Sequence, residues 1–132
     1  MKALEIFKNV PKEKNYPLFS EPPDLLPLTF GRDVMDENDL AQLTCIAAKG
    51  DEPMTVSWTF HGNNISSDLG IITTPIGGRG SLLVISAITF KHGGKYTCIA
   101  KNDAGVRHQT VELKVNGRYY QEGTVNILFY FI

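Results

Sequence analysis

The two cysteines, Cys45 and Cys98, are the residues of this sequence with the clearest chemistry. Each lies in an apolar, β-branched stretch, and the chain has no Cys-x-x-Cys pair. Two thiols cannot complete a four-ligand zinc site, which argues against a structural metal. A disulfide between them would close a long loop, stabilise the fold by roughly 4 kcal/mol in the chain-entropy treatment, and persist only in an oxidising compartment. Two buried free thiols in a reducing compartment are the alternative.

The other polar residues do not form a recognisable catalytic or metal-binding set. His61, His92 and His108 fall in turns or near a strand start, and we expect them to be exposed. Ser66 to Asp68 are neighbours in one turn, whereas a catalytic triad requires a base positioned in space. The acidic run Asp36 to Asp39 lacks the alternating spacing and the glycine of an EF-hand calcium loop. We therefore predict no enzyme activity, no metal and no cofactor.

Asn64-Ile65-Ser66 is a sequon for N-linked glycosylation, because the middle residue is not proline. Triplets of this kind also arise by chance, and an asparagine that caps a turn is the alternative interpretation. In a turn of a disulfide-bonded domain, Asn64 becomes a candidate glycosylation site.

Length and charge exclude several classes of partner. The chain has 132 residues, enough for one ordinary domain. Its 13 basic and 14 acidic residues nearly balance, so the basic stripe of a nucleic-acid binder is missing. No apolar run approaches the roughly 20 residues of a membrane span, which argues against direct membrane insertion.

From residue 40 onward, short alternating apolar runs are separated by turn clusters rich in glycine and asparagine. Strands at this spacing predict an all-β sandwich or barrel. The runs cover residues 40–49, 54–60, 70–76, 81–88, 95–100 and 107–115.

Alternation with a period of two assigns the faces of these strands. Cys45 and Cys98 each point to the apolar side of their run, so the two sulfurs can meet across a core between two sheets. Trp58 is expected to pack on them. Tyr96 shares the core face with Cys98, and its hydroxyl can bond backbone at the preceding corner, as in a tyrosine corner.

These residues together resemble an immunoglobulin domain of the intermediate set over residues 22–116. The resemblance rests on Cys45, Trp58, the Leu83–Ile85 strand, the Tyr96–Cys98 motif and the Asn102–Gly105 turn. It implies an all-β, two-sheet immunoglobulin sandwich with one inter-sheet disulfide. The expected core residues are Trp58, Tyr96, Leu83 and Ile85. The family usually has aspartate two positions before the corner glycine, where this chain has His92 before Gly94, so the usual Asp–Arg bridge is not expected.

The stretches "FGRDVMDEN", "KGDEPMTVSWTFHGNNISSDLGIITTPIGGRGSLLVI" and "HGGKYTCIAKNDAGV" resemble, more narrowly, the arthropod hypervariable Down syndrome cell adhesion molecule (Dscam) family. They are similar to its seventh immunoglobulin domain, one of those encoded by arrays of alternative exons. The resemblance implies the extracellular part of a plasma-membrane receptor of neurons and immune cells. Its partners would be neighbouring immunoglobulin domains and an identical copy, paired antiparallel, in neuronal self-recognition and axon guidance.

The two ends of the chain do not share this resemblance. We expect residues 1–21 and 117–132 to be weakly ordered tails outside the domain. "YPLFSE" can be encoded by a pyrimidine-rich splice acceptor, and "GR" by a splice donor, so the tails are interpreted as intron read-through beside one exon. Genuine but divergent linkers are the alternative.

The outward faces of the predicted sheets differ in polarity. The sheet containing residues 54–60, 95–100 and 107–115 is polar outside, with Ile99 as the exception. The other sheet has Ile46, Leu82 and Val84 outside, bordered by Thr44, and such a cluster is typical of a contact surface. Cover by the chain's own first strand, by the tails or by a neighbouring domain is the alternative.

The sequence therefore predicts a variable recognition module that binds an identical copy. Two other functions stay open. One is an extracellular immune receptor domain that captures foreign ligands. The other is a structural repeat of the giant muscle-protein kind, which would need neither the disulfide nor the sequon.

Overall fold

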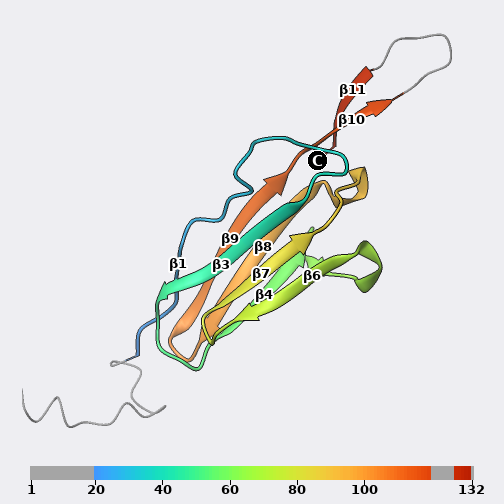
Figure 1. Cartoon of the computed structure of the whole chain (residues 1–132). Helices are drawn as coiled ribbons and strands as arrows, with labels where there is room; N and C mark the ends of the chain where they lie inside the picture. Colours follow the sequence, from blue (N-terminus) through green and yellow to red (C-terminus); the bar gives the residue numbers. More distant parts are fainter. Residues whose placement is uncertain (1–19, 120–126, 132) are drawn as a thin grey trace, which may run out of the picture.

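A computed structural model describes residues 20–119 and 127–131 of the chain (Figure 1). Most of the expected N-terminal tail, 1–21, and part of the expected C-terminal tail, 117–132, lie outside the described residues. The expected domain boundary at residue 116 falls within a strand, β10 (Val115–Tyr119), that pairs with β11 (Ile127–Phe131) beyond the end of the sandwich (Figure 1).

The alternating runs form two four-stranded sheets, which confirms the predicted all-β sandwich. One sheet has the order β1-β3-β7-β6, and the other has the order β5-β4-β8-β9. A further three-stranded ladder, β11-β10-β2, joins β2 to β10 in parallel. The elements are β1 (Asp24–Leu25), β2 (Met35–Asp36), β3 (Ala41–Lys49), β4 (Thr55–Phe60), β5 (Asn63–Asn64), the 3₁₀ turn η2 (Ser67–Leu69), β6 (Ile71–Ile76), β7 (Gly80–Ile85), the 3₁₀ turn η3 (Phe90–His92), β8 (Gly94–Asn102), β9 (Gly105–Leu113), β10 (Val115–Tyr119) and β11 (Ile127–Phe131).

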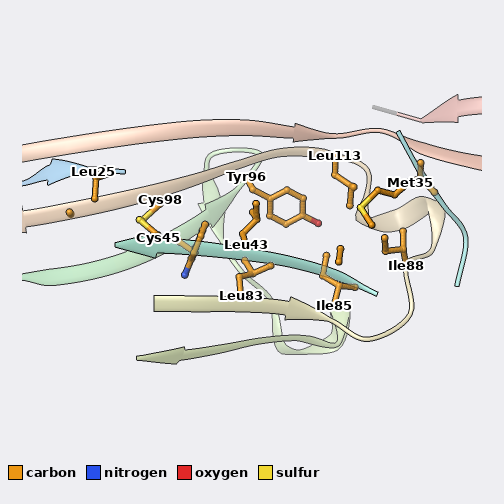
Figure 2. Packing of buried hydrophobic residues seen from close by; sticks show 14 of the residues in the cluster. Leu25, Met35, Leu43, Cys45, Leu83, Ile85, Ile88, Tyr96, Cys98 and Leu113 are labelled. Carbon is orange, nitrogen blue, oxygen red and sulfur yellow. A yellow bond between two sulfur atoms is a disulfide. The ribbon is translucent and has the colours of Figure 1, made fainter. Parts of the chain in front are cut away.

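Register between neighbouring strands places every second side chain in the core. β3 pairs with β7 so that Leu43 lies opposite Leu83 and Ala41 lies opposite Ile85, and all four are buried. Tyr96 on β8 of the other sheet is fully buried and faces these side chains (Figure 2). Removing such apolar surface from water is the main favourable term in folding.

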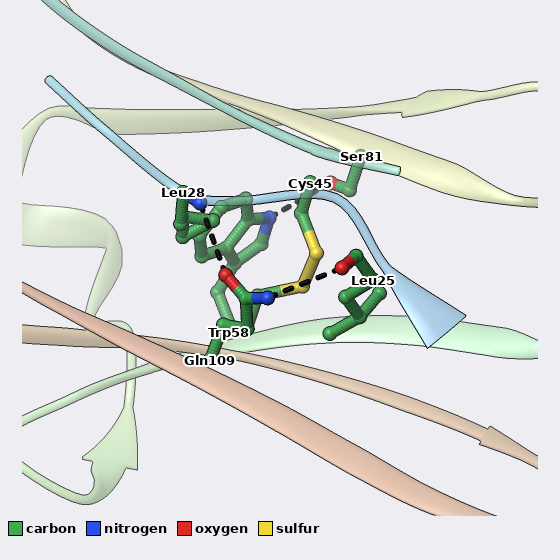
Figure 3. Close-up of a disulfide and its surroundings, with 7 residues drawn as sticks. Leu25, Leu28, Cys45, Trp58, Ser81 and Gln109 are labelled. Atoms are coloured by element: carbon green, nitrogen blue, oxygen red, sulfur yellow. Dashed lines mark hydrogen bonds between the residues drawn. A yellow bond between two sulfur atoms is a disulfide. The ribbon is translucent and has the colours of Figure 1, made fainter. Parts of the chain in front are cut away.

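The predicted disulfide is confirmed and links the two sheets. Cys45 on β3 bonds Cys98 on β8, with 6.4 Å between their Cα atoms. Trp58 on β4 lies beside this bond (Figure 3). Its indole Nε1 donates a 2.9 Å hydrogen bond to the Ser81 hydroxyl on β7, which is also buried. The one polar atom of the ring is therefore satisfied inside the core, as a buried indole requires.

A tyrosine corner closes the turn before β8. The Tyr96 hydroxyl donates a 2.6 Å hydrogen bond to the His92 carbonyl. The Tyr96 ring stacks on Phe60 at a centroid distance of 4.6 Å and meets Phe30 edge-on at 5.8 Å. Burial raises the pKa of the Tyr96 phenol above its ordinary value, because the charged form would lose its hydration.

A glutamine side chain fastens the first strand to the opposite sheet. Gln109 on β9 accepts a hydrogen bond from the Leu28 amide at 3.0 Å and donates one to the Leu25 carbonyl at 3.2 Å (Figure 3). The segment that begins with β1 therefore crosses from β3 to β9, which helps to close that side of the sandwich.

Removing the disulfide tests its part in stability. The double variant Cys45→Ala/Cys98→Ala should lose about 4 kcal/mol of unfolding free energy, because the unfolded chain regains the freedom of the closed loop. Urea denaturation of the oxidised parent and the double variant measures this loss. An unchanged midpoint would show that the bond adds nothing to the fold.

Alkaline pH should destabilise the protein through Tyr96. Below about pH 10, the folded and unfolded states both keep the phenolic proton. Above it, the unfolded tyrosine ionises while the buried one stays protonated, so the unfolding free energy falls by up to about 1.4 kcal/mol per pH unit. Denaturation between pH 8 and pH 12 should show a steeper loss for the parent than for Tyr96→Phe. Parallel slopes would contradict this assignment.

Candidate recognition surface

The outer face of the β1-β3-β7-β6 sheet is the candidate recognition surface, and strand register sets which residues it displays. Because Leu83 and Ile85 point inward, the alternate residues of β7 point outward. Three rows result across β3, β7 and β6: Gln42, Val84 and Ile72; Thr44, Leu82 and Thr74; Ile46, Gly80 and Ile76.

All four interface residues predicted from the sequence lie on this face. Ile46, Leu82 and Val84 are half-buried among their neighbours, and Thr44 is exposed. The side chains of Ile46, Leu82 and Val84 are neither part of the core nor fully covered by the described part of the chain. They form the centre of an apolar strip along β7 and its neighbour β3.

The sequence analysis missed the contribution of β6. Ile72 is 59% exposed and Ile76 is 38% exposed, and both lie in the outward rows. Ile71 and Ile72 are adjacent in the sequence, so alternation alone did not say which of them faces the core. Pairing of Ile71 with Ile85 decides it, because it turns Ile71 inward and leaves Ile72 outside.

A shallow hollow lies at one margin of the face. Its volume is about 390 Å³, and its lining includes Gln42 and Thr44 from the outward rows. Leu40, which is 57% exposed, stands on its rim. The remaining lining residues are Pro27, Thr29, Phe30 and Gly31. We define the recognition face as the outward rows together with Leu40 and this hollow.

The outer face of the other sheet has a different character. Lys95 lies opposite Glu112 across β8 and β9. The Thr97 and Thr110 hydroxyls share a hydrogen bond of 2.8 Å on the same face. Most outward side chains of this face are polar and remain hydrated, and the apolar exceptions are Ile99 and the 39% exposed Val106.

Charged side chains at the rim differ in whether neighbouring groups of the chain already bind them. Arg79 donates hydrogen bonds to the carbonyls of Ala47 at 3.1 Å and Gly50 at 3.0 Å, and its guanidinium forms an ion pair with Glu52 at 3.4 Å. It therefore fastens the loop after β3 and is not a free rim charge. Lys49 is exposed and remains available at the rim.

Asp68 is also an exposed rim charge. The Ser66 hydroxyl donates a hydrogen bond to its carboxylate, and this bond holds the pKa of Asp68 below its usual value. Asp68 therefore stays negative at neutral pH.

The expectation that all three histidines are exposed is wrong for His92. His61 and His108 are exposed, but His92 is buried at the corner formed by η3. Its Nδ1 accepts a 2.9 Å hydrogen bond from the Thr89 amide, and its Nε2 donates to the Leu69 carbonyl at 2.6 Å. The ring thus ties this corner to the turn before β6.

The acidic run forms a turn of its own. The Asp36 amide donates to the Asp39 carboxylate at 3.2 Å, and Arg32 lies 3.9 Å from the same carboxylate. Within residues 20–119 and 127–131, no three acidic, histidine or cysteine side chains converge as ligands for a metal ion. No helix in that part of the chain has the length and apolar content that a bilayer crossing requires.

Comparison with known proteins decides the family. The profile of the immunoglobulin domain family matches residues 22–102. The chain belongs to this family.

This immunoglobulin domain is homologous to domains of Dscam cell adhesion molecules. It is 36% identical over 96 residues to the cell adhesion molecule Dscam1 of Drosophila melanogaster, a match that covers 72% of this chain and 5% of that protein. The DSCAM protein of Gallus gallus is 37% identical over 90 residues, with 67% of this chain and 4% of that protein covered. The chain thus spans about a twentieth of these relatives.

Solved structures give the same result for the immunoglobulin domain. The Dscam1 Ig7 domain, isoform 5, superposes with a TM-score of 0.69 at 38% identity, covering 72% of this chain and 97% of that one. The I67–I69 fragment of titin has a TM-score of 0.64 at 22% identity, covering 75% of this chain and 34% of that one, and shows the fold alone.

Replacing the buried histidine should weaken the immunoglobulin domain. His92→Ala leaves the Leu69 carbonyl and the Thr89 amide without their partner, and we expect a loss of about 2 kcal/mol of unfolding free energy. His108→Ala is the matched control on the exposed surface of β9 and should stay within about 0.5 kcal/mol of the parent. Thermal and urea denaturation measure both. Equal effects of the two substitutions would refute the structural role of His92.

Proposed function

We propose that this domain is an isoform-specific recognition module of a cell-surface adhesion receptor and that it binds an identical copy through the recognition face. The observation that carries the proposal is the contrast between the two outer faces. One presents Ile72, Ile76, Leu82 and Val84 to solvent, whereas the other presents mainly polar side chains, with Ile99 and Val106 as apolar exceptions. An apolar patch with a polar border is typical of a protein interface.

Homology favours adhesion over other uses of the fold. The named relatives are cell adhesion molecules. The Cys45–Cys98 bond suits the oxidising environment outside a cell, and a structural repeat in a reducing compartment would not retain it. We therefore place the domain in the extracellular part of a plasma-membrane receptor, with a role in neuronal self-recognition.

The shape of the domain suits a place in a row of similar domains. The described chain begins at one end of the sandwich, and β10 leaves it at the opposite end (Figure 1). A DSCAM structure of the N-terminal eight Ig domains contains a matching segment at 36% identity, which covers 75% of this chain and 13% of that one. Immunoglobulin domains on either side are the expected neighbours within the receptor.

Pairing of identical faces would be isologous. An axis of two-fold symmetry near the middle of β7 would run the facing strands antiparallel and place the Leu82 side chains of the two copies close together. The Val84–Ile72 row of one copy would then cover part of the apolar strip of the other. Because both copies contribute the same surface, a single self-complementary face is enough to form the dimer.

Discrimination between isoforms would follow from the same symmetry. A substitution that suits its own copy leaves a clash or an unpaired charge when the partner carries the original residue. Lys49 and Asp68, two exposed charges at the rim, are well placed for this effect. One domain pair buries little area, so strong adhesion requires several domains or many copies acting together.

A charge placed in the recognition face should abolish pairing. The full chain is coupled densely to beads, and bead aggregation is measured for the parent, Val84→Asp and Ile72→Asp. Both variants should lose aggregation, because two buried carboxylates would face an apolar strip without compensating cations. Their melting temperatures should stay close to that of the parent, since both positions lie outside the core.

The matched control places the same charge on the other sheet. Thr55 is exposed on β4 and lies opposite Lys101 on β8, so Thr55→Asp should leave aggregation unchanged. Loss of aggregation in the control, or its persistence in both face variants, would reject this face as the site of pairing.

A further inference from the structure

We propose that Asn64 carries an N-linked glycan that shields an open edge of the β5-β4-β8-β9 sheet. Asn64 lies on β5 opposite Thr59, on the face turned away from the buried Trp58. Its side chain is exposed and makes no hydrogen bond within the described part of the chain. The amide nitrogen is thus free to bear a bulky group without disturbing the core.

The glycan would be attached in the secretory pathway, so this inference rests on the extracellular location proposed above. The donor is an oligosaccharide linked through pyrophosphate to a membrane lipid. The Asn64 Nδ2 atom forms a bond to C1 of the first sugar, the C1–O bond to the pyrophosphate breaks, and the amide gives up one proton while the lipid pyrophosphate leaves. The Ser66 hydroxyl supplies the second recognition element of the sequon.

The sequence contains no second site for this reaction. Asn64 is the only asparagine of the whole chain that is followed two residues later by serine or threonine. Its neighbour Asn63 has Ile65 at that position and cannot serve. A single attachment point means that the protective effect of the glycan is confined to one part of the surface.

That part of the surface contains an unprotected strand edge. β5 has two residues and pairs only with Thr59 and Phe60 of β4. The segment Thr55–Trp58 of β4 has no outer neighbour among the described strands. Free N–H and C=O groups along such an edge can pair with another chain, which is a route to aggregation.

An open cleft adjoins the same edge. Its volume is about 550 Å³, and it lies between β4 and β6 of the two sheets. Half-buried apolar side chains line it, among them Val56, Ile65 and Ile71. Ile65 and Ser66, the two residues that follow Asn64, are part of the lining, so a glycan at Asn64 would stand beside the mouth of the cleft.

The glycan would leave the recognition face free, because Asn64 belongs to the other sheet. Edge pairing would be hindered while face pairing continued. The modification would thereby direct self-association to one surface, which is the property that a receptor based on self-matching requires.

The first experiment tests attachment. The full chain is secreted from insect cells behind an added signal peptide, and intact masses are measured before and after treatment with peptide N-glycosidase. The parent and the control Asn63→Gln should carry added mass that the enzyme removes, converting Asn64 to aspartate. Asn64→Gln and Ser66→Ala should lack this mass. A secreted parent without a glycan would overturn the proposal.

The second experiment tests shielding without face pairing. In the Val84→Asp background, sedimentation velocity compares glycosylated protein with the same protein after enzymatic removal of the glycan. Removal should increase the oligomer fraction severalfold. An unchanged fraction would refute shielding. If both face variants still aggregated on beads while the mass result held, only pairing through the recognition face would be refuted, so the two failures can be told apart.

Discussion

The bond between Cys45 and Cys98, with Trp58 packed beside it, is the constraint on which the rest of this structure depends. It joins the central strands of two sheets, and it can form only if both cysteines face the same core. Once these strands are placed, alternation dictates the direction of every neighbouring side chain. The buried Trp58–Ser81 hydrogen bond adds a polar link between the same two sheets, so their relative position is defined by more than apolar contact.

The recognition face is a direct consequence of that arrangement. Residues of β7 that alternate with the core residues Leu83 and Ile85 must point outward, and in this chain they are apolar. On the other sheet, most of the equivalent outward positions are polar, with Ile99 and Val106 as exceptions. The difference has no benefit for the fold of one domain, since exposed aliphatic side chains gain nothing from water. In the proposed pairing it would become useful, because a second copy would cover this face while a glycan at Asn64 shielded the free edge of the other sheet.

Much of the fold could be predicted from local pattern, because strand period, turn residues and the motif around Tyr96 act over short distances. His92 shows where this reasoning stops. A histidine beside two glycines has the sequence character of an exposed turn, yet η3 turns its ring inward to the Leu69 carbonyl. Gln109 is a second case, since its bonds reach Leu25 and Leu28 from a distant strand. No local signal reveals such partners, because they are defined by chain segments that meet only after folding.

The sequence by itself determined the succession of short strands, the core-facing direction of both cysteines and the polarity of each strand face, because these follow from a period of two and from residue type. Only the tertiary structure decided which of Ile71 and Ile72 faces water, because both are apolar and the choice depends on the register of β6 against β7. It also decided that Arg79 is bound to the carbonyls of Ala47 on β3 and Gly50 in the following loop, while Lys49 stays exposed at the rim. Contacts across sheets and loops set these outcomes, and such contacts have no counterpart in the order of residues along the chain.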